Sequence, residues 1–499
     1  MGTDFDPVVN ALRNSLGDVG YSHCEVIRLS RLLDQFDVWD GKVPSAGLSE
    51  DERIDRYMTA GNKLRELTKR GDALVGAAVE EIWRFRERMG KPSDGGPPEG
   101  LDNHAYILNS LKHPEEVRRL QTIYGPGFVL LGVYLSEELL ADSLSKKIAD
   151  SHSTQNVQQF RKRAQELITR DSFEPETRFG QNVRNTFFMA DLFVDASDAK
   201  KLSQSIQRFI ELMFGHPSYT PTRDEAGMYQ AYSSALLSAS LNRQVGASIT
   251  TSDGQLIATG VNEVPKPGGG YYWEDMEASE DDRDFRRGAD SNDVIQNEIL
   301  QDLLEKLEKN GWLLKTEIPN DIHEVRTRLT GTRLLDVIEF HRAVHAETAA
   351  LLDAARRGVS IQDCTLYCTT FPCHNCAGHI IAAGIKRVVY IEPYPKSKAR
   401  DFYEKAFTTD PKQNNRVCLS PFVGVGPRRY RDLFSTTTSD GTRIERADNR
   451  GQAIKPAERE KRLKIGTLST SQFDNEAGFI ENLRDTLRAV RFQKEDTNE

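Results

Sequence analysis

In the first half of the chain, apolar runs that suit buried strands alternate with amphipathic stretches that suit helices. Residues 104–112 begin as a strand, 114–125 predict a helix opened by proline and closed by glycine, and 126–135 are almost continuously apolar. A continuous apolar run is typical of a parallel strand buried on both faces. A helix over 137–152, then a helix and strand over 182–197, continue the alternation. This order predicts a doubly wound α/β domain.

A proline-rich stretch, 216–222, interrupts the helical pattern and predicts a domain boundary near residue 215. A helix over 224–240 follows. Residues 245–264 read as a hairpin with Asp253-Gly254 at its turn. A second domain is therefore expected to begin with a helix and an antiparallel pair of strands.

Residues 268–293 are rich in glycine and then in charge, which favours a mobile surface loop. A substrate lid is the alternative, because three aromatic residues stand beside three glycines. Residues 294–312 predict an amphipathic helix. The end of the chain is polar and is expected to be loosely ordered, with one helix over 475–493. The predicted organisation is a first domain over 1–215, a second over 216–435 and a tail over 436–499.

Two αβ units in the second domain carry the strongest pattern. A helix over 346–357 ends at Gly358, and an apolar strand over 364–371 follows. Pro372 then precedes a helix that ends at Gly384, and 387–392 form another strand. Two helices are thus predicted to begin next to one another, on an α/β/α frame with a mixed sheet.

The starts of those helices carry His345, Cys373 and Cys376. A catalytic zinc site uses three protein ligands and keeps one position open for water, and one imidazole with two thiolates supplies such a set. The i, i+3 spacing of the cysteines places both sulfurs on one face, and a helix N-terminus favours the thiolate. We therefore expect Zn²⁺ as the cofactor, with these three residues as its ligands.

Glu347 lies two residues beyond the histidine and is expected to be catalytic. A carboxylate there can take a proton from the zinc-activated water and pass it on. The pattern H-x-E followed by P-C-x-x-C is the signature of zinc nucleobase deaminases. The alternatives are a structural zinc knuckle, with His374 or His379 as fourth ligand, and a redox C-x-x-C. Glu347 and the α-β-α frame favour the catalytic interpretation.

Composition limits the remaining possibilities. The chain has 499 residues, a net charge of −9 and a mean hydropathy of −0.55. No apolar run approaches the roughly 18 residues of a membrane span, and the N-terminus does not read as a signal peptide. A cytoplasmic protein with no membrane partner is expected. The other cysteines are expected to be reduced, buried thiols: Cys24, Cys364, Cys368 and Cys418. A second metal site at Cys364 and Cys368 is the alternative.

Beyond the zinc motif, the chain resembles the deoxycytidylate deaminase family from Tyr229 to about Glu392. The matching segments are Asn242–Ala247, Thr259–Asn262, the HAE triplet and PCxxC. The whole chain is more similar still to bacterial two-domain antiphage dCTP/dCMP deaminases, which join a P-loop-kinase-like domain to such a deaminase. Further matching segments are 27–30, 60–65, the SLKHPEEV stretch, Gly180-Gln181, 283–285 and 392–399.

This resemblance implies deamination of dCTP and dCMP to the deoxyuridine nucleotides, which starves an infecting phage of dCTP. It also implies restraint of the activity until infection, in some members by a small RNA or by a nucleotide effector. The same resemblance implies that the protein assembles into a homo-oligomer. The G-x-x-x-x-G-K-[ST] phosphate loop of the first domain is absent from the sequence. Gly2 and Thr3 are left as a weak anion site at a helix N-terminus, and a regulatory and assembly role is expected for the domain.

The resemblance also suggests substrate contacts. Asn262 would contact the deoxyribose, with turn capping as the alternative. Arg243 would support the site or a phosphate, with a surface ion pair as the alternative. Tyr394, Lys396 and Lys398 follow the strand after the zinc helix. One aromatic face and two cations suit a base and a polyphosphate. An ordinary solvated loop is the alternative.

Two other classes of function compete. A deaminase that edits bases in tRNA or single strands needs a basic groove with stacking aromatics, which the net charge of −9 disfavours. A regulatory scaffold with a decayed deaminase is the second. The intact set of His345, Glu347, Cys373 and Cys376 argues against decay.

Overall fold

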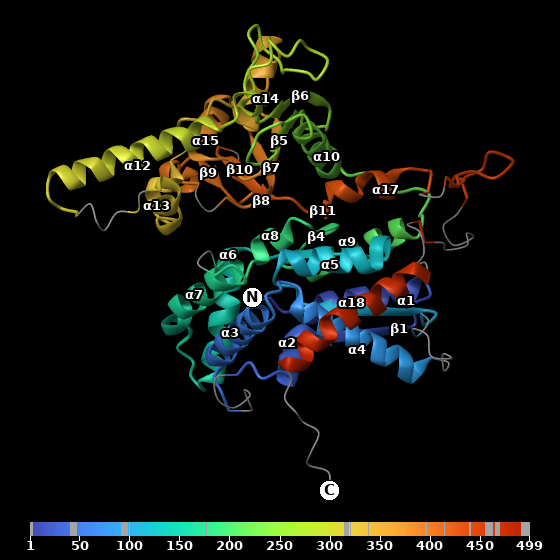
Figure 1. Cartoon of the computed structure of the whole chain (residues 1–499). Helices are drawn as coiled ribbons and strands as arrows, with labels where there is room; N and C mark the ends of the chain where they lie inside the picture. The colour runs from blue at the N-terminus through green and yellow to red at the C-terminus, as the bar shows by residue number, and fades with distance from the viewer. Residues whose placement is uncertain are drawn as a thin grey trace. The chain divides into compact units, whose positions relative to one another are not determined.

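The computed structural model forms two compact units, Met1–Thr220 together with Val423–Glu499, and Pro221–Phe422 (Figure 1). The first boundary lies close to the predicted one. The second differs, because residues after Phe422 group with the N-terminal unit instead of forming the end of the deaminase domain and a separate tail. The residues described are 3–39, 47–90, 98, 100–174, 177–313, 319, 321–337, 339–394, 397–413, 415–438, 441–454, 463–464 and 470–490.

The N-terminal unit contains parallel strands, in agreement with the predicted α/β class. β1 (His23–Arg28) pairs in parallel with β2 (His104–Asn109). β3 (Leu131–Tyr134) pairs in parallel with β4 (Leu192–Asp195), and β11 (Gly424–Val425) adds an antiparallel edge. Sequence patterns missed β1, a short strand in which Ile27 is the one buried residue. They also did not anticipate that the strands form two separate sheets.

Helices pack with these sheets in apolar cores, among them one around α4 (Ala73–Met89) and one around α9 (Ala199–Met213). The helix α5 begins with a capping box in which His113 and Glu116 satisfy each other's backbone amides. The helices of the unit are α1 (Asp6–Asp18), α2 (Leu29–Leu32), α3 (Glu50–Thr68), α4 (Ala73–Met89), α5 (Pro114–Tyr124), α6 (Glu137–Ser151), α7 (Arg161–Ser172), α8 (Val183–Phe187), α9 (Ala199–Met213), α17 (Tyr430–Phe434) and α18 (Thr470–Ala489).

The late helix, α18, corresponds to the helix predicted over 475–493, and its packing into the N-terminal core was not expected of a polar tail. Phe479, Leu483 and Leu487 follow one stripe at four-residue spacing and are buried with α4 and α5. Glu476 is fully buried; it pairs with Arg86 and accepts a hydrogen bond of 2.6 Å from the Tyr124 hydroxyl. Apolar burial and a paired carboxylate together hold this helix in place.

The second unit is built on a six-stranded mixed sheet in the order β6-β5-β7-β8-β10-β9, as the predicted cytidine-deaminase-like fold requires. β5 pairs antiparallel with β6 and with β7, whereas β7, β8, β10 and β9 run parallel. The strands are β5 (Gly246–Thr250), β6 (Leu256–Val261), β7 (Thr365–Thr370), β8 (Arg387–Glu392), β9 (Phe407–Thr408) and β10 (Val417–Pro421).

Two glycines allow helices to approach opposite faces of this sheet. A Cβ at Gly246 would lie 1.9 Å from the Ala231 carbonyl of α10 (Arg223–Ala235). A Cβ at Gly260 would lie 2.1 Å from the Ala346 carbonyl of α14 (Ala346–Arg356). Gly260 pairs across the hairpin with Ala247, which directly follows Gly246. Because successive residues of a strand face opposite sides, the two glycines lie on opposite faces of the sheet. The α/β/α layers that position the site follow from these contacts.

A long insertion separates β6 from α14 and contains α11 (Asp284–Arg287), α12 (Ser291–Lys309) and α13 (Ile322–Arg328). The predicted helix over 294–312 corresponds to α12. The stretch expected to be a mobile loop holds buried charged residues, because Asp281 and Arg283 form an ion pair of 2.8 Å. The remaining helices of the unit are α15 (His374–Ala382) and α16 (Ala399–Phe402).

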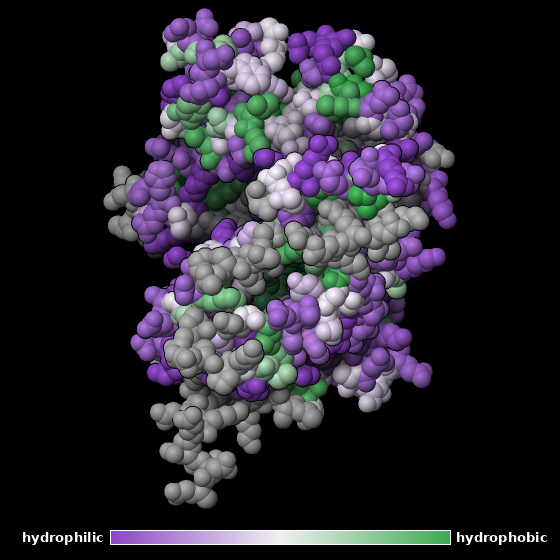
Figure 2. All heavy atoms as spheres, turned by 90° about the vertical axis from the view of Figure 1, so that its right-hand side faces the viewer, coloured by the Kyte–Doolittle hydropathy of each residue, from purple (hydrophilic) through white to green (hydrophobic). Residues whose placement is uncertain are grey.

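Hydrophilic residues cover most of the face shown in Figure 2, and apolar residues appear there in small separate patches. Within the described residues, no helix is both long and apolar enough to cross a membrane.

Candidate metal centre

His345, Cys373 and Cys376 come together as the sequence predicts. His345 Nδ1 lies 3.3 Å from Cys373 Sγ and 3.5 Å from Cys376 Sγ, and the three ligand atoms lie within 4.8 Å of one another. Two ligands of a tetrahedral zinc, at bond lengths of about 2.1 and 2.3 Å, stand about 3.6 Å apart. The observed spacing and the donor set of one imidazole and two sulfurs therefore fit a zinc ion.

Two helix N-termini hold this group. His345 occupies the N-cap position of α14, and Cys373 occupies that of α15. The Cys376 amide donates to Cys373 Sγ at 3.4 Å. Hydrogen bonds with the Cys376 thiol and with His345 hold the pKa of Cys373 below its ordinary value. One sulfur of the pair is thus held as a thiolate, the form that binds a metal.

Glu347 lies in the first turn of α14 and is 4% exposed. Burial raises the pKa of its carboxyl above the ordinary value, and the nearby Cys373 thiolate adds to this effect. A buried carboxyl with a raised pKa, two residues from a metal ligand, is suited to taking up and releasing a proton during a reaction.

No fourth side chain joins the metal group within the described part of the chain. The two histidines considered as a fourth ligand have other neighbours: His379 Nδ1 lies 3.0 Å from the Thr348 hydroxyl, and His374 Nε2 lies 3.7 Å from Glu339. A three-ligand set is what a catalytic zinc site requires, whereas a structural site has four protein ligands. The arrangement therefore favours the catalytic alternative.

Sequence reasoning missed Thr348. Its hydroxyl donates to Cys376 Sγ at 3.5 Å and also contacts His379, so it orients a sulfur of the metal group. The only signal for it was its position three residues after His345, one helical turn along α14.

The Asn262 side chain binds two backbone groups of the loop that precedes β5. Its Oδ1 accepts from the Val245 amide at 2.6 Å, and its Nδ2 donates to the Arg243 carbonyl at 2.9 Å. These contacts correspond to the capping alternative, with the cap made across the loop that precedes β5. Contact with a deoxyribose stays a prediction.

Arg243 lies close enough to His345 for an electrostatic interaction between their side chains. It also forms an ion pair of 3.0 Å with Glu392. Its guanidinium also lies over the Tyr394 ring, 5.6 Å from the centroid. The structure thus brings Arg243 and Tyr394 together. Lys398 pairs instead with Asp401 at 3.0 Å on an exposed surface, and Lys396 lies outside the described residues.

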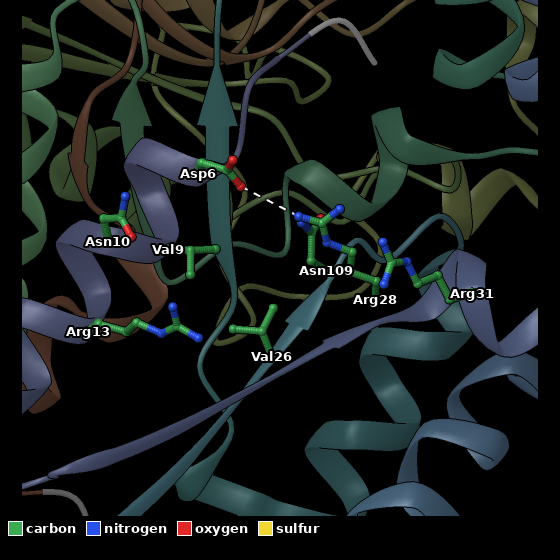
Figure 3. Close-up of a pocket in the computed structure, with 8 residues that line it drawn as sticks. All are labelled: Asp6, Val9, Asn10, Arg13, Val26, Arg28, Arg31 and Asn109. Atoms are coloured by element: carbon green, nitrogen blue, oxygen red, sulfur yellow. Dashed lines mark ion pairs between the residues drawn. The ribbon is translucent and has the colours of Figure 1, made fainter. Parts of the chain in front are cut away.

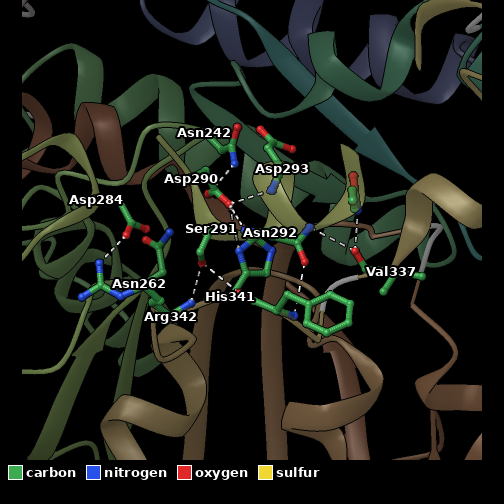
Figure 4. Close-up of polar contacts among 12 residues, drawn as sticks. Asn242, Asn262, Asp284, Asp290, Ser291, Asn292, Asp293, Val337, His341 and Arg342 are labelled. Carbon is green, nitrogen blue, oxygen red and sulfur yellow. Dashed lines mark hydrogen bonds and ion pairs between the residues drawn. The ribbon is translucent and has the colours of Figure 1, made fainter. Parts of the chain in front are cut away.

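Asp290, in the insertion, reaches the loop that carries Arg243 (Figure 4). Its Oδ2 accepts from Asn242 Nδ2 at 2.9 Å, and its Oδ1 caps α12 through the Asn292 amide at 2.8 Å. Its Oδ1 also lies 3.6 Å from His341 Nδ1. Sequence reasoning did not find this residue, because an aspartate in a charged segment carries no distinguishing signal.

The predicted anion site at the start of the chain is only partly described. Gly2 lies outside the described residues. Beside Thr3, the Asp4 carboxylate accepts from the Asp6 amide at 3.1 Å. The N-terminus of α1 therefore carries carboxylates of its own, an arrangement that does not favour an anion.

The other cysteines stand apart from the metal group. Cys364 and Cys368 are buried in the apolar core of the deaminase unit, and Cys418 is buried as well. Cys24 is only partly buried, which differs from the expectation of a buried thiol. Among the described residues, none of these four belongs to a cluster of metal-ligating side chains.

The comparisons with known proteins agree with this geometry. Residues 221–392 match the family described as the cytidine and deoxycytidylate deaminase zinc-binding region. Through this part, the chain belongs to that family. The match also identifies the region as zinc-binding, and His345, Cys373 and Cys376 form the metal-ligating group within it.

The similarity to individual proteins is local. The deoxycytidylate deaminase of Enterobacteria phage T2 is 51% identical over 55 residues, which are 11% of this chain and 29% of the phage protein. The tRNA-specific adenosine deaminase of Buchnera aphidicola is 32% identical over 114 residues, 22% of this chain and 72% of that protein. The dCMP deaminase of cyanophage S-TIM5, solved with dCMP and dUMP, is 19% identical with a TM-score of 0.23, covering 41% of this chain and 99% of that one. The matched stretch thus spans less than a third of the phage T2 enzyme.

Proposed function

We propose that the chain is a zinc-dependent hydrolase that converts free deoxycytidine nucleotides, dCTP or dCMP, to dUTP or dUMP and ammonia. The observation that carries the proposal is the buried Glu347 beside a metal group of three ligands. Family membership and the deoxycytidylate deaminases among the relatives support the same reaction class.

The proposed roles follow from the chemistry of each side chain. His345, Cys373 and Cys376 would hold the zinc ion, which when bound brings the pKa of a coordinated water toward neutrality. Glu347 would take a proton from that water as it adds to C4 of the cytosine ring. The same carboxyl would return protons to the ring nitrogen and to the amine that leaves as ammonia, so that one water is consumed for each ammonia released.

Charge supports a free nucleotide as the substrate. The chain carries a net charge of −9, whereas binding of a nucleic-acid strand depends on cations that replace counterions along the backbone. The paired Arg243 and Tyr394 offer one cation and one aromatic face for a nucleotide. We include both residues, together with Asn262, Lys396 and Lys398, in the proposed substrate region.

A wider role is proposed from the resemblance to antiphage deaminases. The enzyme would lower the dCTP pool during phage infection, and the N-terminal unit would act as a kinase-like regulatory and assembly module. A small RNA or a nucleotide would restrain the activity, and the enzyme would work as a homo-oligomer in the cytoplasm.

Deamination of a base in tRNA is the second candidate, because the Buchnera tRNA-specific adenosine deaminase is matched over 72% of its length. An enzyme of this kind splays out and stacks a base from a strand. The two candidates share the metal group and differ in the substrate that binds next to it.

A panel of substrates separates them. Ammonia release by the zinc-loaded protein is measured with dCMP, dCTP, deoxycytidine, CMP, a cytosine-containing single strand and tRNA, with Glu347→Gln as the matched inactive control. The proposal expects turnover of dCMP or dCTP that exceeds turnover of either polymer. Turnover of tRNA or of the single strand alone would favour the second candidate, and no turnover of any substrate would contradict both.

A further inference from the structure

The N-terminal unit contains a cavity of about 370 Å³ lined by three arginines (Figure 3). Arg13 comes from α1, Arg28 ends β1, and Arg31 comes from α2. The other lining residues are Asp6, Val9, Asn10, Val26 and Asn109. This volume falls in the range of small-molecule sites, which measure roughly 300–1,000 Å³.

The cavity lies where ligands of α/β proteins bind. Arg28 and Asn109 are the last residues of the parallel strands β1 and β2 and stand opposite each other in register. In open α/β sheets, ligands bind just beyond the carboxyl ends of the strands. Asn109 adds an amide to the cavity from the second strand, and Asn10 adds another from α1.

The charges of this cavity are not balanced by its own residues. Three arginines and one aspartate line it, so its lining residues carry a net charge of +2. Arg28 lies 3.5 Å from Asp6, but their side chains are 50% and 72% exposed, so the pair contributes little. Within the described ranges, Arg13 and Arg31 take part in no ion pair. A chain with a net charge of −9 thus gathers unpaired guanidinium groups in one hollow.

Guanidinium groups bind phosphate oxygens through two parallel hydrogen bonds, and several such groups around one cavity suit a ligand with several charges. We propose that this cavity binds an oligophosphate, a di- or triphosphate chain that is either free or attached to a nucleoside. Arg13, Arg28 and Arg31 hold the phosphates, and the Asn10 and Asn109 amides supply further donors. The proposal does not depend on the deaminase activity, because the residues belong to the other unit.

Calorimetric titration of the full-length protein with inorganic triphosphate and with dATP tests this site. dATP is chosen because it lacks the cytosine that the proposed active site recognises. Both ligands are expected to bind saturably, and more weakly as salt is raised. Tighter binding of dATP would identify a nucleoside phosphate as the ligand, and equal binding would identify the phosphate chain alone.

Arg31→Gln and Arg13→Gln are each expected to weaken binding by about tenfold or more, because each removes charged hydrogen bonds to phosphate. Arg53→Gln is the matched control, since Arg53 is an arginine of the same unit that already pairs with Glu50 at 2.7 Å. The affinity of Arg53→Gln for triphosphate is expected to stay within about twofold of that of the unaltered protein.

Thermal unfolding provides a second readout that does not depend on calorimetry. Triphosphate is expected to raise the Tm of the unaltered protein and of Arg53→Gln, and to raise it less in Arg31→Gln. Without ligand, Arg31→Gln is expected to be at least as stable as the unaltered protein, because it removes repulsion between like charges. Absence of saturable triphosphate binding at low salt, or equal weakening by all three substitutions, would overturn the proposal.

Discussion

The side-chain amide of Asn242 donates a hydrogen bond of 2.9 Å to Oδ2 of Asp290, and Asp290 is only 8% exposed. Asn242 directly precedes Arg243, whereas Asp290 lies in the insertion between β6 and α14. This contact therefore ties the insertion to the loop that carries Arg243, a cation that interacts electrostatically with His345.

We predict that Asp290→Ala raises KM for the deoxycytidine nucleotide, because the Arg243 loop loses its anchor. Loss of the α12 cap costs about 1 kcal/mol of stability in addition. Asp321→Ala is the control: Asp321 caps α13 through the His323 amide at 2.9 Å, within the same insertion. The control is expected to lose similar stability with unchanged KM, measured by denaturant unfolding and steady-state kinetics. Equal kinetic effects of the two substitutions would show that Asp290 acts only as a cap.

We predict that Cys376→Ala loses bound zinc, because two ligands and water do not retain the ion against dilution or a chelator. Cys418→Ala is the matched control, a buried cysteine outside the metal group. The control is expected to keep about one zinc per chain, as measured by elemental analysis after gel filtration. Full zinc content in Cys376→Ala would remove that residue from the ligand set.

The metal group was predictable from sequence because its residues follow a known pattern, H-x-E and then P-C-x-x-C. His345 begins one helix, Cys373 and Cys376 begin another, and spacing alone fixes the face on which they lie. Asp290 and Thr348 were not predictable in this way. Asp290 is 48 residues from Asn242, and only the folded insertion brings the two together.

We predict that Asn262→Ala destabilises the protein by about 1–3 kcal/mol, because the Val245 amide and the Arg243 carbonyl both lose their partner. Asn310→Ala serves as the control, since Asn310 is an exposed asparagine that donates to the Lys306 carbonyl at the end of α12. Its unfolding free energy is expected to change by less than about 0.5 kcal/mol. Denaturant unfolding measures both, and equal losses would contradict the bridging role of Asn262.

We predict that Glu476→Ala destabilises the N-terminal unit by about 3–5 kcal/mol, because Arg86 is left buried without its partner carboxylate. Glu481→Ala is the control, an exposed glutamate on the same helix. Thermal unfolding is expected to show a lower Tm for the first variant and an unchanged Tm for the second. An unchanged Tm in both would mean that α18 contributes nothing to this core.

The placement of α18 shows where sequence reasoning stops. The stripe of Phe479, Leu483 and Leu487 predicts an amphipathic helix, but no sequence pattern specifies which surface it covers. The polar residues before it suggested a loose tail. Pairing of β11 with β4 was equally invisible, because two residues are too short for a periodic signal. Long strands and helices of the deaminase unit, such as β8 and α14, were predicted to within about two residues.

The central claim is that Glu347 moves protons for a zinc-dependent deamination. Its most direct test is ammonia release from dCMP and dCTP by Glu347→Gln, with zinc content measured on the same sample. The amide fills the same space but cannot accept or release a proton, so turnover is predicted to fall by about 10²–10⁴-fold or more while zinc content and Tm stay unchanged. Ammonia release at the rate of the unaltered protein, from a fully zinc-loaded sample, would contradict the account.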